Sequence, residues 1–133
     1  MKKINGFTLI EILVVVTIIS LMTATAAVTY TAFLKQSRDA KRKADLGQIS
    51  AALEMYRSNN DTYPTTGLSQ LTAPTVYIQS IPIDPKNPTY TYYYSGTASD
   101  YTLGSYLEGG GTTCVAGQCG GNCNYCLGPY GQK

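Results

Sequence analysis

The most regular feature of this sequence is an uncharged apolar run near its start. Between Ile12 and Leu34 the chain carries no charged residue, and this stretch is about as long as a helix that crosses a bilayer core. Apolar side chains occupy every side of the expected helix instead of one stripe. That pattern suits lipid or a tightly packed bundle better than the surface of a soluble domain.

The helix signal continues beyond the apolar run, but its character changes. No proline occurs within Phe7–Ser58, so one unbroken helix of about 52 residues is expected. Leu46, Ile49, Leu53 and Tyr56 recur at spacings of 3, 4 and 3, which places them on one helical face. We therefore expect the second half of the helix to be amphipathic and to pack on a small globular domain.

The remaining chain predicts loops and short strands. Thr89–Ser95 and Asp100–Leu107 are rich in Tyr and Thr, and residues 96–99 between them predict a hairpin turn. Residues 67–71 are expected to form a short helix. The segment from Gly109 onward is rich in Gly and Cys, has no periodicity, and needs covalent or metal support to be ordered. The fold class is therefore α+β, with a long N-terminal helix packed on a small antiparallel sheet.

One carboxylate, Glu11, lies inside the apolar run. A carboxylate in a membrane helix costs roughly 2.5–3.5 kcal/mol at the bilayer centre and less near the interface. No Lys, Arg or His between Phe7 and Leu34 can pair with it. If the chain were cut after Gly6, Phe7 would gain a positive α-amine about one helical turn from Glu11. A neighbouring copy of the chain can supply that amine instead.

The string Gly6-Phe7-Thr8-Leu9-Ile10-Glu11, after a short basic leader and before an apolar helix, resembles the class III signal of type IV pilins and type II secretion pseudopilins. The resemblance implies cleavage between Gly6 and Phe7 by a membrane-embedded prepilin peptidase, N-methylation of Phe7, and packing of each subunit on its neighbour's N-terminus through Glu11. An ordinary secretory signal is the alternative. It fits poorly, because the apolar run is too long and no small-residue cleavage site follows it.

The middle of the chain is similar to the major pseudopilin, general secretion protein G. Its LxxYxxxNxxYP motif and P-x-DP loop match Leu53, Tyr56, Asn60, Tyr63, Pro64, Pro82, Asp84 and Pro85. This resemblance implies a type IV pilin-like fold with three parts: a leader at 1–6, a transmembrane or filament-core helix at 7–34, and an amphipathic helix with a globular domain and Cys-rich tail at 35–133. The family's calcium-binding aspartates are not matched, since Glu108 and then GGGTTC stand in that region.

Charge and cysteine content disagree about which side of a membrane the domain occupies. Basic residues gather just after the apolar run: Lys35, Arg38, Lys41, Arg42 and Lys43. By the positive-inside rule this cluster would be cytoplasmic. Four cysteines in the last 20 residues favour an oxidising, extracytoplasmic compartment instead. Together with the family resemblance they lead us to expect the cluster near the outer headgroups, facing acidic surfaces of neighbours after assembly.

Four cysteines in the tail are the expected source of its order: Cys114, Cys119, Cys123 and Cys126. Two disulfides are the favoured interpretation, with three possible pairings that the sequence does not rank. A zinc site is the alternative, but only the last two cysteines have CxxC spacing. A redox role is weaker still, because no βαβ context surrounds that pair.

The composition argues against an enzyme. The chain has no His and no phosphate-binding Gly loop, so no catalytic residue, metal or cofactor is expected. Asp84 and Asp100 are interpreted as a turn residue and a strand-start residue. Twelve Tyr suggest half-exposed strands more than a stacking surface for nucleic acid, because the globular part offers only Arg57, Lys86 and Lys133 as basic neighbours.

The function that follows is structural. We expect a subunit of a type IV pilus-like filament, held in the cytoplasmic (inner) membrane by a single pass and then polymerised into an extracellular or periplasmic helical homo-oligomer. The resemblance implies as partners the prepilin peptidase, an inner-membrane assembly platform and an assembly ATPase. One alternative is the major pseudopilin of a type II secretion system. Another is a single-pass, membrane-anchored binding module that never polymerises.

Overall fold

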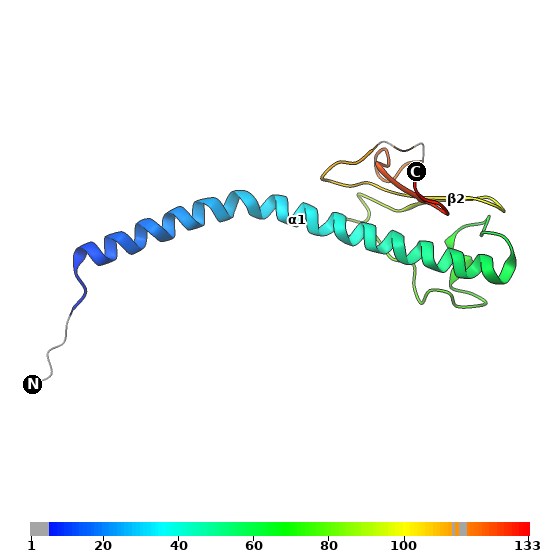
Figure 1. The fold of residues 1–133 in the computed structure, drawn as a ribbon, viewed down its shortest axis with the longest axis horizontal. Coiled ribbons are helices and arrows are strands. Elements are labelled where there is room, and N and C mark those ends of the chain that lie inside the picture. Colours follow the sequence, from blue (N-terminus) through cyan, green and yellow to red (C-terminus); the bar gives the residue numbers. More distant parts are fainter. Residues whose placement is uncertain (1–5, 113, 115–116) are drawn as a thin grey trace, which may run out of the picture. The chain divides into compact units, whose positions relative to one another are not determined.

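One helix, α1 (Leu9–Asn60), accounts for 52 residues of the chain (Figure 1). The computed structural model describes residues 6–112, 114 and 117–133, so most of the expected leader, residues 1–5, lies outside the described residues. The chain divides into two compact units, Met1–Lys35 and Gln36–Lys133. The expected single helix is confirmed, although it begins and ends two residues later than predicted.

The amphipathic stripe forms the core of the second unit. Leu46, Ile49 and Leu53 are fully buried, and Tyr56 packs against the same cluster from a partly buried position. Burying each such aliphatic side chain stabilises the fold by about 1.5–3 kcal/mol. From the rest of the chain the core receives Tyr63, Leu71, Tyr101 and Leu103. The spacing of 3 and 4 thus correctly identified the face of α1 that the domain covers.

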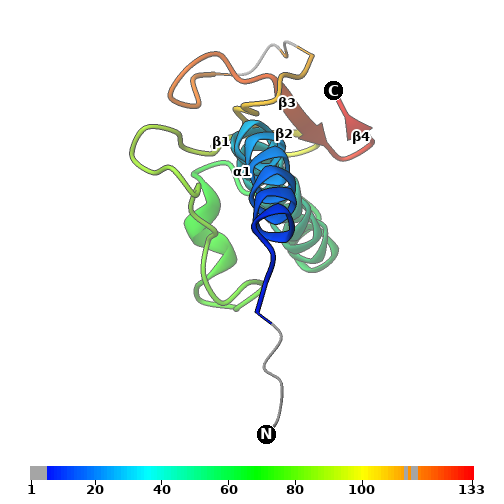
Figure 2. The ribbon, with the colours of Figure 1, turned by 90° about the vertical axis from the view of Figure 1, so that its left-hand side faces the viewer.

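A four-stranded antiparallel sheet lies along this part of α1 (Figures 1 and 2). Its strands pair in sequence order: β1 (Tyr93–Gly96), β2 (Tyr101–Ser105), β3 (Tyr125–Gly128) and β4 (Gly131–Gln132). The α+β prediction is confirmed. A 3-10 helix, η1 (Leu68–Leu71), stands where a short helix was expected, in the loop that follows α1.

The predicted hairpin is present, with two corrections. Both strands are shorter than predicted, because residues 89–92 run outside the sheet and β2 ends at Ser105. The turn lies one residue later than expected, since Gly96 pairs with Tyr101 and the Thr97 N–H donates to the Asp100 carbonyl at 2.7 Å. Alternation of Tyr and Thr marks extended chain but does not reveal where a partner strand stops.

The tail contributes more regular structure than its sequence predicts. Strand β3 pairs with β2 over Leu103–Ser105, and β4 closes a short hairpin on β3. Two glycines lie where the backbone of another segment packs closely. A Cβ at Gly111 would collide with the Asn124 carbonyl oxygen, and a Cβ at Gly120 (φ 82°) would collide with the Thr89 carbonyl oxygen. The tail therefore lacks a hydrophobic period partly because several of its positions must be glycine, where the backbone packs closely or turns.

Candidate functional site

The surface of α1 from Leu9 to Leu34 is mostly apolar. Large apolar side chains are exposed on all sides of this part of α1, with exposed fractions from 37% at Leu34 to 83% at Leu9. By length and composition α1 qualifies as a membrane-spanning helix. A single chain in water would leave this surface uncovered, so lipid or other helices must cover it.

Five hydroxyl groups within the apolar run donate hydrogen bonds to carbonyls of the helix itself. Thr17 donates to the carbonyl oxygen of Val14 at 2.8 Å, and Ser20 donates to that of Val16 at 2.6 Å. Thr23, Thr25 and Thr29 bond in the same way to carbonyls three or four residues earlier. These groups therefore cost little in lipid or in a helical bundle.

The helix begins with a capping box that the sequence expectation overlooked. Thr8 precedes α1, and its backbone N–H and its hydroxyl both donate to Glu11 Oε2, at 2.8 and 2.7 Å. The Glu11 N–H lies 3.4 Å from the Thr8 hydroxyl oxygen, which closes the reciprocal pattern. The spacing T-x-x-E was the signal for it.

This capping box changes the expected environment of Glu11. The Phe7 amine was expected to be its sole nearby partner, but in the uncut chain Thr8 already binds one carboxylate oxygen. No described residue donates to the other oxygen, Oε1. Gly6 and Phe7 precede the helix as exposed, non-helical chain.

The basic cluster that follows the apolar run divides into two groups. Lys35, Lys41 and Lys43 are exposed, as expected for side chains that face headgroups or neighbours. Arg38 and Arg42 instead turn onto carboxylates of their own chain. For these two arginines the expectation of an outward-facing cluster was wrong, because Asp84 and Glu108, which draw them inward, lie far away in the sequence.

Arg42 is the largest fully buried side chain of the domain, with 0% of its surface exposed. Its Nε and Nη2 donate to both oxygens of Asp84, at 2.7 and 3.1 Å. Its Nη1 donates to Asp39 at 2.7 Å and to Glu108 at 3.1 Å. Burial opposes the charge, but these hydrogen bonds outweigh it and raise the pKa of Arg42 further.

Glu108 ties the segment after β2 to the same place on α1. Arg38 forks onto both Glu108 oxygens at 2.7 Å, and Lys86 Nζ reaches Oε2 at 2.9 Å. Asp39 accepts the backbone N–H groups of Glu108 and Gly109 at 2.9 and 2.7 Å. The guanidinium-carboxylate group of Arg38, Asp39, Arg42, Asp84, Lys86 and Glu108 is called the ion cluster below. Asp84 was expected to be only a turn residue, and its part in this cluster was missed.

The ion cluster predicts that stability falls in acid. Hydrogen bonds from Arg38, Lys86 and Arg42 outweigh burial and hold the pKa of Glu108 far below its usual 4.5. In the unfolded chain Glu108 binds a proton at a higher pH than in the folded chain. The free energy of unfolding should therefore decrease as the pH falls below about 4.5.

Urea unfolding of the full chain in detergent, between pH 7 and pH 3, measures this effect. The Glu108→Gln variant cannot titrate at this position, so it should be less stable at pH 7 and lose less stability on acidification. An identical pH slope in both proteins would contradict the assignment to Glu108.

The residues of the LxxYxxxNxxYP pattern hold the loop after α1 onto the helix. Tyr63 is buried against Tyr101, with ring centroids 4.8 Å apart. Its hydroxyl donates to Glu54 at 2.9 Å and accepts from Arg57 at 2.9 Å. The Pro64 carbonyl accepts the Tyr94 hydroxyl at 2.6 Å. These contacts hold the loop in place, and the polar groups that form them are bonded to one another.

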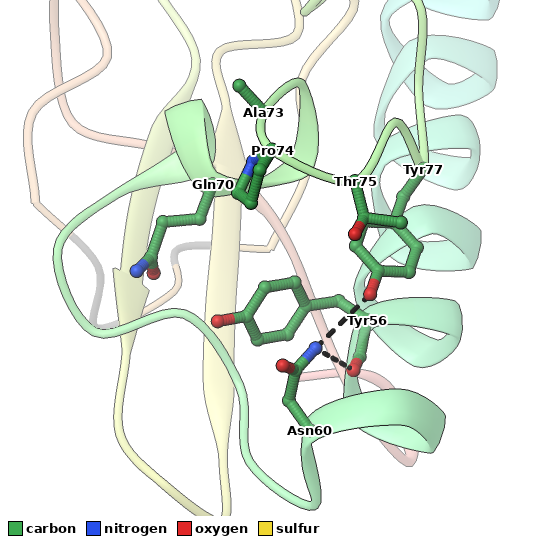
Figure 3. Close-up of a pocket in the computed structure, with 7 residues that line it drawn as sticks. All are labelled: Tyr56, Asn60, Gln70, Ala73, Pro74, Thr75 and Tyr77. Carbon is green, nitrogen blue, oxygen red and sulfur yellow. Dashed lines mark hydrogen bonds between the residues drawn. The ribbon is translucent and has the colours of Figure 1, made fainter.

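A small pocket lies beside the C-terminal end of α1 (Figure 3). Asn60 donates from its side-chain amide to the Tyr56 carbonyl at 2.9 Å and to the Tyr77 hydroxyl at 3.2 Å. Tyr56 and Tyr77 meet edge to face, with centroids 5.4 Å apart. Asn60 therefore fixes the loop that carries Tyr77, and the pocket follows from that packing.

The four cysteines form two disulfides in the structure. Cys114 pairs with Cys126, which is in β3, and Cys119 pairs with Cys123. Cys119, Cys123 and Cys126 are fully buried in a small second core. Gly104 of β2 leaves room for them, because a Cβ there would lie 3.0 Å from the Cys123 sulfur.

Two family models match the chain. The model described as "Type II secretion system (T2SS), protein G" matches residues 29–117, and the "Prokaryotic N-terminal methylation motif" matches residues 1–27. No solved structure matches the chain significantly.

Several curated proteins are similar over most of the chain. The type II secretion system core protein G of Pseudomonas aeruginosa is 34% identical over 128 residues, covering 84% of this chain and 90% of that protein. Its namesake from Vibrio cholerae is 33% identical, covering 84% of this chain and 87% of that protein. A probable minor fimbrial protein of Dichelobacter nodosus is 36% identical over 62 residues, which is 47% of this chain and 39% of that protein.

Proposed function

Because the chain belongs to the type II secretion system protein G family, we propose that it is the major pseudopilin of such a system. It is a structural subunit and not an enzyme. Of the two filament readings that the sequence left open, the relatives favour this one over the type IV pilus subunit expected first.

One observation carries the proposal: the helix that bears the folded domain is apolar on all sides before it enters the domain. In a membrane this surface faces lipid, and in a filament it faces the same helix of neighbouring copies. The exchange of lipid for helices costs little hydrophobic free energy, because both environments are apolar. A single-pass subunit can therefore leave the inner membrane and enter a periplasmic helical homopolymer.

Processing at Gly6 would prepare the subunit for this step. The junction of Gly6 and Phe7 lies outside the helix and is exposed, as a peptidase substrate must be. Cleavage followed by methylation of the Phe7 amine, by a prepilin peptidase, is supported by the match to the N-terminal methylation motif. The assembly platform and the ATPase of the secretion machinery would then act on the mature subunit.

We expect the mature N-terminus to be a methylated Phe7, and Gly6→Leu to block maturation. A Cβ at Gly6 would lie in open space, with no atom outside its chain neighbours within 4 Å, so a failure of Gly6→Leu would point to the peptidase and not to the fold. N-terminal mass spectrometry of membrane-extracted protein measures both results. A terminus at Met1 or beyond Leu34 in the wild type would contradict the proposal.

A type IV pilus subunit remains the second candidate, supported by similarity to the minor fimbrial protein. Deletion of the gene in the organism that carries it distinguishes the two. A pseudopilin deletion should abolish release of a set of proteins into the medium, with surface filaments unchanged. A pilus subunit deletion should remove sheared surface filaments that contain peptides of this chain. A membrane-anchored module that does not polymerise would give neither result.

A further inference from the structure

The ion cluster gathers carboxylates from distant segments around the cation of a side chain. Carboxylates from three separate parts of the chain, Asp39, Asp84 and Glu108, converge on one fully buried cation, the Arg42 guanidinium. Proteins bind calcium with several carboxylate and carbonyl oxygens gathered in this way. We propose that Arg42 takes the place of a divalent cation, so that the unit Gln36–Lys133 folds and holds its C-terminal segment without calcium.

The first support is that the carboxylates are fully engaged. Each of the six oxygens of Asp39, Asp84 and Glu108 accepts at least one hydrogen bond from a described residue. Glu108 Oε2 also accepts Lys86 Nζ, and Asp84 Oδ1 accepts the Lys86 N–H at 2.7 Å. A calcium ion would have to break several of these bonds before it gained a ligand.

The second support is the charge balance. Three cationic side chains, Arg38, Arg42 and Lys86, meet three carboxylates within salt-bridge distance, so the formal charge of the ion cluster is zero. Adding Ca²⁺ would leave a net charge of +2 around a buried guanidinium, which is strongly unfavourable in a poorly solvated site. Removal of the Arg42 charge alone leaves −1, which attracts a divalent cation.

The third support comes from the segment for which the family resemblance implies calcium-binding aspartates. In this chain the segment after β2 carries one carboxylate, Glu108, and three glycines follow it. Within the described part of the chain, no group of three potential metal ligands is placed to hold an ion. The residues present therefore do not fit calcium, and Arg38 and Arg42 hold this segment to α1 instead.

Thermal unfolding of the full chain in detergent tests the proposal, with calcium either removed by chelator or present at 5 mM. The wild-type melting temperature should be the same in both. Arg42→Ala should melt more than about 10 °C lower in chelator, because it leaves buried carboxylates without their cation. Calcium at 5 mM should raise the melting temperature of this variant by at least about 5 °C.

Terbium(III) gives a second readout at the same position. The Tyr90 ring centroid lies 5.4 Å from the Arg42 guanidinium carbon, close enough to sensitise terbium luminescence in the vacated site. Luminescence that calcium displaces should appear in Arg42→Ala and be absent in the wild type. The luminescence should be absent in the double variant Arg42→Ala/Asp84→Asn, because this variant also lacks one of the three carboxylates.

Two controls make the outcome decisive. Arg57→Ala removes a partly buried arginine of α1 that donates to the Tyr63 hydroxyl, and it should show no calcium response. Arg42→Gln fills more of the vacated space if Arg42→Ala does not fold, and it should show the same gain of calcium and terbium binding. A wild-type melting temperature raised by calcium would overturn the proposal. So would folded Arg42 variants that bind neither ion. Neither result bears on whether the subunit polymerises.

Discussion

Glu11→Gln subunits are expected to insert into the membrane and to be cleaved at Gly6, yet to assemble into filaments more than about 100-fold less well than wild type. The proposed filament brings the Phe7 amine of one subunit to Glu11 of another within an apolar core. Removal of one partner of such a buried pair typically costs about 3–5 kcal/mol, and each 1.4 kcal/mol is tenfold in affinity.

The geometry at the start of α1 leaves room for the second partner that we propose for Glu11. Its Oε2 accepts both donors of Thr8, which fixes the carboxylate at the start of α1. No described residue donates to its Oε1, so that oxygen is free to accept a neighbour's amine. In the proposed filament, a subunit out of register would leave the amine and the carboxylate without each other, so the pair would act as a register device.

Sedimentable filament per cell, compared with total cleaved subunit, measures the effect of Glu11→Gln. Two variants serve as controls. Glu11→Asp keeps the charge and should assemble better than Glu11→Gln, and Thr17→Ala removes a hydroxyl that bonds only within the helix. Wild-type filament yield from Glu11→Gln, with normal cleavage, would show that Glu11 does not set the register.

Removal of the Cys114–Cys126 disulfide is expected to cost about 3 kcal/mol, and removal of Cys119–Cys123 about 2 kcal/mol. The difference arises because the first bridge closes the longer loop, with a sequence separation of 12 against 4. Cys126 also lies in β3, so its release should loosen the pairing of β3 with β2.

Urea unfolding of the double-serine variants, Cys114→Ser/Cys126→Ser and Cys119→Ser/Cys123→Ser, measures the two costs separately. Thiol counting on the unreduced wild type should find no free thiol. Four reactive thiols together with one bound zinc ion would instead restore the metal interpretation of the tail.

Features set by local spacing could be predicted from the sequence, and the inward orientation of two arginines could not. The uncharged run and the face of α1 with Leu46, Ile49 and Leu53 were both predictable, because each depends on spacing within a few helical turns. The capping box of Thr8 and Glu11 was equally local and could have been predicted from its spacing. By contrast, nothing near Arg38 or Arg42 distinguishes them from the exposed lysines beside them.

The sequence by itself determined that a long apolar helix leads into an amphipathic one and carries a small α+β domain, because hydrophobic periodicity is a local property. Only the tertiary structure decided that Arg42 turns inward, since its carboxylate partners Asp84 and Glu108 lie 42 and 66 residues away. It likewise decided the pairing of the cysteines and the addition of β3 to β2. A buried charge is stable only where distant partners meet it, so its position depends on how the whole chain packs.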